Sequence, residues 1–146
     1  MSNIKELTEE TIQEFLQRES LLLKNDAGEQ ALSHRLAVVL EPKFKEWNID
    51  CEYNRDVEAV KRLRYALSPN GNIEDRDVIP DIIIHRRKTS DNLLVIEIKK
   101  STNRESDDKD IAKLRAFREQ LGYQNGLFVR FLTGASEVGI QTKNWV

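Results

Sequence analysis

Three charged residues interrupt two apolar runs in the middle of this sequence. Asp81 follows Pro80 and precedes three isoleucines, whereas Glu97 and Lys99 lie within the run LLVIEIKK. Two carboxylates and an ammonium beside buried strands cost several kcal/mol unless something compensates them. A divalent cation is the natural compensator for two carboxylates, and hard oxygen ligands favour Mg²⁺ or Mn²⁺ over zinc. These residue types therefore indicate metal-assisted chemistry.

The spacing of the three residues predicts that they converge. Residues two apart in a strand project from the same face, so Glu97 and Lys99 point together. The short polar linker RKTSD between the two runs is typical of a hairpin. If Arg86 lies opposite Asn92, the register places Asp81 opposite Glu97. Each residue also has a structural alternative. Asp81 could be a polar residue that starts a strand after proline, and Glu97 and Lys99 could form a cross-strand or same-face ion pair.

The elements that must position these residues follow from the period of the apolar residues. Helical spacing predicts helices over residues 8–23, 26–47 and 107–121. Continuous or alternating apolar runs predict strands over residues 49–56, 78–86, 92–100, 126–132 and 139–146. We expect Thr8 to cap the first helix, Pro42 to bend or end the second, and Gly122 to stop the third. Residues 57–77 should be partly irregular. The order predicts an α/β protein, a mixed sheet with helices on both faces.

The stretch Pro80-Asp81, followed by Glu97-Ile98-Lys99 after a hydrophobic strand, resembles the signature of the PD-(D/E)xK nuclease superfamily. The resemblance implies a restriction-endonuclease-like fold, a three-layer α/β/α arrangement with a central mixed sheet of four to five strands. In that family the PD aspartate and the (D/E)xK acid bind the metal. The lysine positions or activates the attacking water and stabilises developing phosphate charge. The resemblance thus assigns metal binding to Asp81 and Glu97, and catalysis to both of them and Lys99.

The activity implied by this resemblance is an Mg²⁺-dependent endonuclease or phosphodiesterase, with Mn²⁺ able to substitute. DNA is the expected substrate, and RNA is the less favoured one. Two alternatives remain from the sequence: a non-catalytic nucleic-acid-binding domain that keeps the fold, and a protein-interaction module.

Further candidate residues come from the resemblance and from the charges around the motif. Many members of the superfamily add a metal-binding glutamate from the first core helix, and Glu29 is the candidate here, on the same helix face as Leu32. The alternative is a capping box between Asp26 and Glu29. Asp110 is expected to be a helix-start acid within reach of the site. Four basic residues are candidates for contact with nucleic acid, the alternative being a solvated surface: Lys100, Arg104, Lys113 and Arg55.

Length and composition bound the remaining expectations. A chain of 146 residues suits a single domain, with an N-terminal helical segment at 1–25, a core at 26–132 and a C-terminal strand or tail at 133–146. Cys51 is the only cysteine, so neither a disulfide framework nor a cysteine metal cage is expected, and the cytoplasm is the default compartment. No stretch approaches the roughly 18 apolar residues of a membrane span.

The charge balance bears on the expected partners. The net charge is −2 and the pI is about 5.8, which mildly disfavours tight nonspecific binding of DNA through bulk charge. Net charge does not exclude a local basic groove. A homodimer is expected, since one small domain offers little surface with which to grip a duplex.

Overall fold

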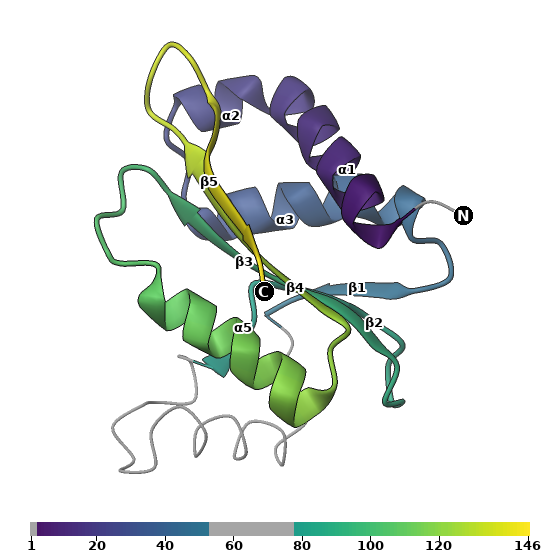
Figure 1. Ribbon diagram of the computed structural model, residues 1–146. Helices are drawn as coiled ribbons and strands as arrows, with labels where there is room; N and C mark the ends of the chain where they lie inside the picture. The colour runs from purple at the N-terminus through teal and green to yellow at the C-terminus, as the bar shows by residue number, and fades with distance from the viewer. Residues whose placement is uncertain (1–2, 53–77) are drawn as a thin grey trace.

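A five-stranded mixed sheet forms the centre of the protein (Figure 1). The computed structural model describes residues 3–52 and 78–146. The strands are β1 (Asn48–Cys51), β2 (Ile82–His85), β3 (Asn92–Lys100), β4 (Asn125–Leu132) and β5 (Gly139–Trp145), and they lie in this order across the sheet. Neighbouring strands are antiparallel, except that β3 and β4 are parallel. The expected α/β class with a mixed sheet is confirmed.

Helices cover both faces of this sheet, as Figure 1 shows. The helices are α1 (Ile4–Arg18), α2 (Ser20–Lys24), α3 (Glu29–Leu40) and α5 (Asp108–Leu121), with a 3₁₀ turn, η1, at Glu41–Lys43. α1 and α3 pack on one face, and α5 packs on the other as the crossover between β3 and β4. None of these helices combines the length and the apolar character that a membrane span requires.

The first two helices begin at residues other than those expected. Asn3 caps α1, its side chain accepting a hydrogen bond from Lys5 N at 2.8 Å. Thr8 lies inside the helix and its hydroxyl donates to Ile4 O, so the prediction that Thr8 is the cap was wrong. α3 begins at Glu29 with Gly28 as its cap, three residues later than predicted. Its capping box does not form, because Asp26 has a left-handed backbone with φ of 55°.

Pro42 and Gly122 act as expected, although α3 ends at Leu40 and so does not reach residue 47 as predicted. The α-helical part of α3 stops at Leu40, and Pro42 lies in the 3₁₀ turn that follows it. Proline lacks the N–H that a regular helix needs at that position. Gly122 ends α5 with a left-handed φ of 68°, a conformation that glycine adopts without steric cost. β1 ends at Cys51, and the expected irregular segment at 57–77 lies outside the described residues.

Alternation along β3 separates two buried clusters. Leu94, Ile96 and Ile98 face α1 and α3 within the larger core. Val95 faces the other side, where it packs in a cluster with Leu114 of α5. Further along the strand this second face becomes charged, because alternation places Glu97 and Lys99 there. The α5 side of the sheet is thus apolar at one end and polar at the other.

The hairpin of β2 and β3 has the register expected from the sequence near its open end. Ile82 pairs with Ile96 and Ile84 pairs with Leu94. Extended by one residue, the same register places Asp81 beside Glu97. At the turn end the register shifts between Ile84 and His85, so that His85, and not Arg86, pairs with Asn92. The shift is a β-bulge close to the turn, so it leaves the pairing around Asp81 unchanged.

Candidate active site

Backbone hydrogen bonds join Asp81, the residue directly before β2, to Glu97 and its neighbour Ile98 in β3. Asp81 N donates to Glu97 Oε2 at 2.8 Å, and Ile98 N donates to Asp81 Oδ2 at 2.7 Å. Glu97 is buried and Asp81 is partly buried. Glu97 is therefore oriented by the backbone N–H of Asp81, the residue before β2, and Asp81 by a backbone N–H of β3, so that their convergence depends on the hairpin register.

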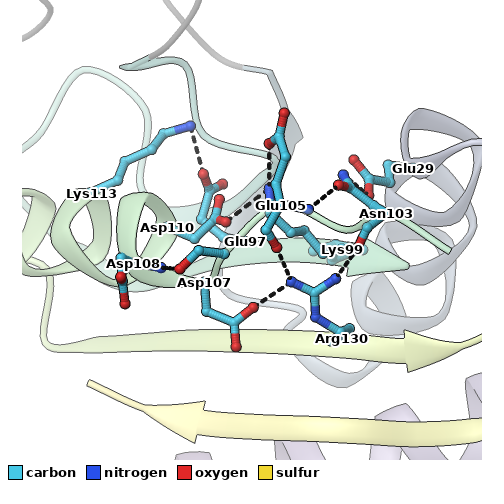
Figure 2. Close-up of polar contacts among 12 residues, drawn as sticks. Glu29, Glu97, Lys99, Asn103, Glu105, Asp107, Asp108, Asp110, Lys113 and Arg130 are labelled. Carbon is cyan, nitrogen blue, oxygen red and sulfur yellow. Dashed lines mark hydrogen bonds and ion pairs between the residues drawn. The ribbon is translucent and has the colours of Figure 1, made fainter. Parts of the chain in front are cut away.

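The first turns of α5 bring complementary charges to the polar end of β3 (Figure 2). Lys113 Nζ lies 2.5 Å from Glu97 Oε1 and also donates to Ile79 O. Asp110 Oδ2 lies 2.9 Å from Lys99 Nζ. The two helix residues are three apart and so share a face of α5. Each charge of the strand thus meets an opposite charge of the helix.

These surroundings change the proton affinity of all three motif residues. Burial, and then the neighbouring charge of Glu97, raise the pKa of Asp81 to about 8. Burial also raises the pKa of Glu97, against the opposing effect of Lys113. Burial alone would lower the pKa of Lys99, but the nearby acids Asp110, Glu29 and Glu105 together outweigh it and the pKa lies above its ordinary value. The two carboxyls therefore resist full ionisation, whereas Lys99 stays positive.

The buried donors fit a hard divalent cation. Asp81 and Glu97 offer carboxylate oxygens, which are the ligands that Mg²⁺ and Mn²⁺ prefer. When ionised, the two carboxylates carry one more charge than Lys113 neutralises, so a further positive charge beside them would favour their ionised form. In residues 3–52 and 78–146, however, no three His, Cys, Asp or Glu side chains already converge as a metal cage.

Glu29 lies at the end of β3 and is engaged with backbone and amide donors. Its Oε2 accepts from Lys100 N at 3.0 Å and from Asn103 Nδ2 at 3.1 Å. The residue therefore connects the start of α3 to the segment after β3, beside the motif and not back at Asp26. Glu29 also helps to raise the pKa of Lys99. A ligand role for Glu29 would require it to exchange these partners for the ion.

The four basic candidates are placed differently from one another. Lys100 Nζ lies 3.3 Å from Asp26 Oδ1, because an even position on β3 points toward the α3 side. Lys113 faces Glu97, so neither lysine presents the open surface that the sequence indicated. Arg104 is exposed in the segment after β3. Arg55 lies outside the described residues.

Arg130 of β4 is a residue of this region that the sequence analysis did not identify. It is buried beside Lys99 in the parallel pair. Its guanidinium donates to the backbone carbonyls of Lys100 at 2.9 Å, Asn103 at 2.6 Å and Glu105 at 2.8 Å, and it pairs with Asp107 (Figure 2). The signal was present, since a charged residue interrupts the apolar run LFVRFL just as Glu97 interrupts its own strand.

Comparison with known proteins adds no family to this description. No protein-family model matches the chain, and no curated protein and no solved structure gives a significant match to it. The function of the chain must therefore be inferred from the geometry of its own residues.

Proposed function

We propose that this protein is a metal-dependent nuclease of the PD-(D/E)xK type, hydrolysing phosphodiester bonds of DNA on a restriction-endonuclease-like fold. The observation that carries the proposal is the convergence of two carboxylates, that of the buried Glu97 and that of the partly buried Asp81. Asp81, directly before β2, and Glu97 of β3 are oriented by backbone N–H groups of the neighbouring segment, and Lys99 follows on the same strand face as Glu97. The mixed sheet with α5 crossing between parallel strands is compatible with that fold.

The roles follow from the charges of the residues. Asp81 and Glu97 would hold Mg²⁺ or Mn²⁺, which when bound lowers the pKa of a coordinated water and polarises the phosphate. Lys99 supplies a fixed positive charge where negative charge develops on the phosphate. Asp110 keeps that ammonium charged and oriented, because it lies 2.9 Å from Lys99 Nζ.

We also propose contacts with the substrate outside the Asp81–Glu97 pair. Arg104 is exposed close to the polar end of β3 and is the best-placed of the described candidates for a backbone phosphate. A second copy of the chain would widen the surface that grips a duplex. DNA and a homodimer are therefore the partners that we propose.

The proposal is tested by incubating purified protein with plasmid, single-stranded DNA and RNA, in Mg²⁺, in Mn²⁺ and in EDTA. We expect cleavage of DNA that needs the metal. Asp81→Asn, Glu97→Gln and Lys99→Ala should each lower the rate by about a hundredfold or more, since each removes a charge aimed at the reacting phosphate.

Matched control variants lie on the surface, away from the polar end of β3. Asp91→Asn changes an exposed carboxylate of the hairpin, and Lys43→Ala changes an exposed lysine after α3. Both should keep the wild-type rate. Folded wild-type protein that binds DNA but cleaves none of the substrates in either metal would refute the nuclease and favour a non-catalytic domain.

A further inference from the structure

The ammonium of Lys113 occupies the position beside the Glu97 carboxylate that a bound metal ion would need. Lys113 Nζ is 2.5 Å from Glu97 Oε1, and the two side chains are only 12% and 2% exposed. Glu97 uses its other oxygen, Oε2, to accept from Asp81 N. Both oxygens of this carboxylate are therefore engaged by the protein itself.

We propose that Lys113 is the resident counter-ion of Glu97, and that a divalent cation must displace it in order to bind the Asp81–Glu97 pair. This inference depends on the proposed metal site. Two cations drawn to one buried carboxylate repel each other at close range, and the low local dielectric strengthens the repulsion. Occupation of Glu97 by the ammonium and by the ion is therefore competitive.

The second partner of Lys113 makes such a displacement feasible. Lys113 Nζ also donates to Ile79 O at 2.5 Å, and this backbone carbonyl does not depend on Glu97. A lysine has a long flexible side chain with three rotatable donors, so its ammonium can leave one acceptor and keep another. Lys113 would therefore remain hydrogen-bonded after it leaves Glu97.

Lys99 is not an equivalent competitor, although it belongs to the same strand face as Glu97. Its ammonium lies 2.9 Å from Asp110 Oδ2 and 3.4 Å from Glu105 Oε2. The acids of α5 and of the preceding segment thus hold Lys99, and Lys113 neutralises Glu97. The two lysines therefore have separable effects: Lys113 determines metal affinity, whereas Lys99 acts on the substrate.

The inference is tested by calorimetric titration of Mn²⁺ into wild type, Lys113→Met and Lys109→Met, without nucleic acid. Methionine keeps the length of lysine and removes the charge, and Lys109 is an exposed lysine of the same helix. Lys113→Met should bind Mn²⁺ at least about tenfold more tightly than wild type, because the competing charge is gone. Lys109→Met should stay within about twofold of wild type, since exposed charges are screened.

If Lys113→Met is too unstable for calorimetry, thermal melting with and without Mn²⁺ provides a second test. In EDTA the variant should melt below wild type, because Glu97 loses its partner, and Mn²⁺ should restore its melting temperature. The double variant Lys113→Met/Glu97→Gln should melt above the single variant in EDTA and show no gain with Mn²⁺. A double variant as unstable as the single one would assign Lys113 a different structural role and overturn the inference.

The remaining outcomes separate this inference from the proposed function. Equal or weaker binding of Mn²⁺ by folded Lys113→Met would overturn the counter-ion role and leave the metal site standing. Absence of Mn²⁺ binding by both wild type and Lys113→Met would overturn the inference together with the metal site.

Discussion

Asp81 is the residue at which burial and a neighbouring like charge act together. Its pKa of about 8 lies far above the ordinary value of 3.8, first because of burial and then because of Glu97. Between these two pH values the folded protein holds a proton that the unfolded chain has lost. The protein without metal should therefore lose stability as the pH rises through this window, since the folded state then binds the additional proton.

A direct prediction concerns the pH profile of unfolding in EDTA. The free energy of unfolding of wild type should fall between about pH 5 and pH 8, by up to about 1.4 kcal/mol per pH unit. Asp81→Asn should remove much of this slope, because its amide is neutral throughout, and Glu97 would account for the remainder. Urea unfolding at stepped pH measures both. Parallel profiles for wild type and Asp81→Asn would show that Asp81 titrates normally; Asp91→Asn is the control and should follow wild type.

The segment from 101 to 107 is the element that assembles the site around the strand ends. In this segment, the side chain of Asn103 donates a hydrogen bond to Glu29, and the carboxylate of Glu105 accepts one from Lys99. Arg130 of β4 holds the segment in place through two of its backbone carbonyls and Asp107, and also donates to the carbonyl of Lys100 at the end of β3. Arginine suits this position because its planar fork presents several donors at once, which a lysine does not.

Removal of the Arg130 guanidinium should make the segment from 101 to 107 less rigid. Arg130→Met leaves carbonyls without their donor and should lower the free energy of unfolding by about 3 kcal/mol. Arg130→Lys should restore only part of the loss. Amide hydrogen exchange should speed up at Glu105, whose N–H donates to the Asn103 side chain.

The matched control for Arg130 is Arg115→Met, which changes an exposed arginine of α5. It should alter neither stability nor exchange. Wild-type exchange at Glu105 in Arg130→Met would mean that the segment holds its shape without the guanidinium.

On the scale of the whole molecule, the candidate site lies at the end of the interface between β3 and α5. At this end both elements change from apolar to charged residues. β3 passes from Val95 to Glu97 and Lys99, and α5 runs back along it from Asp110 to Leu114. Apolar contacts between the layers at one end hold the charged contacts together at the other. Because the unfolded chain lacks this arrangement, a metal bound there would stabilise the fold as a whole.

Metal should therefore raise the melting temperature of the protein. At a free Mn²⁺ concentration about 100 times Kd, the ion adds about 2.7 kcal/mol, which corresponds to roughly 5 to 10 °C. Asp81→Asn should show a smaller rise. In EDTA above about pH 8, where Asp81 of the wild type is ionised, the variant should melt at or above wild type because one repelling charge is gone. Thermal melts of both proteins, with EDTA and with Mn²⁺, measure this, and Asp91→Asn should behave as wild type.

One result would contradict the metal site at this scale. If Asp81→Asn clearly destabilised the protein in EDTA while Mn²⁺ changed neither melt, Asp81 would be held by structural partners only.

Local patterns in the sequence determined the sheet and the motif. Apolar runs and a short polar linker are sufficient to predict the hairpin, and its register brings Asp81 beside Glu97 because strand pairing is set over a few residues. The bounds of β3 and the stop of α5 at Gly122 also follow from local signals. The start of α3 does not, because Asp26 bonds to Thr102 and Thr133, which are distant in the sequence.

Only the tertiary structure decided which charges neutralise the motif. Asp110 and Lys113 resemble ordinary helix charges in the sequence, and Arg130 stands inside an apolar strand with no indication of its partner. Their contacts with Lys99, Glu97 and the segment after β3 depend on how α5 packs across the sheet. Helix spacing specifies a face but not the side chains opposite it, since those come from distant parts of the chain. That packing surrounds the three motif residues with counter-ions from α5.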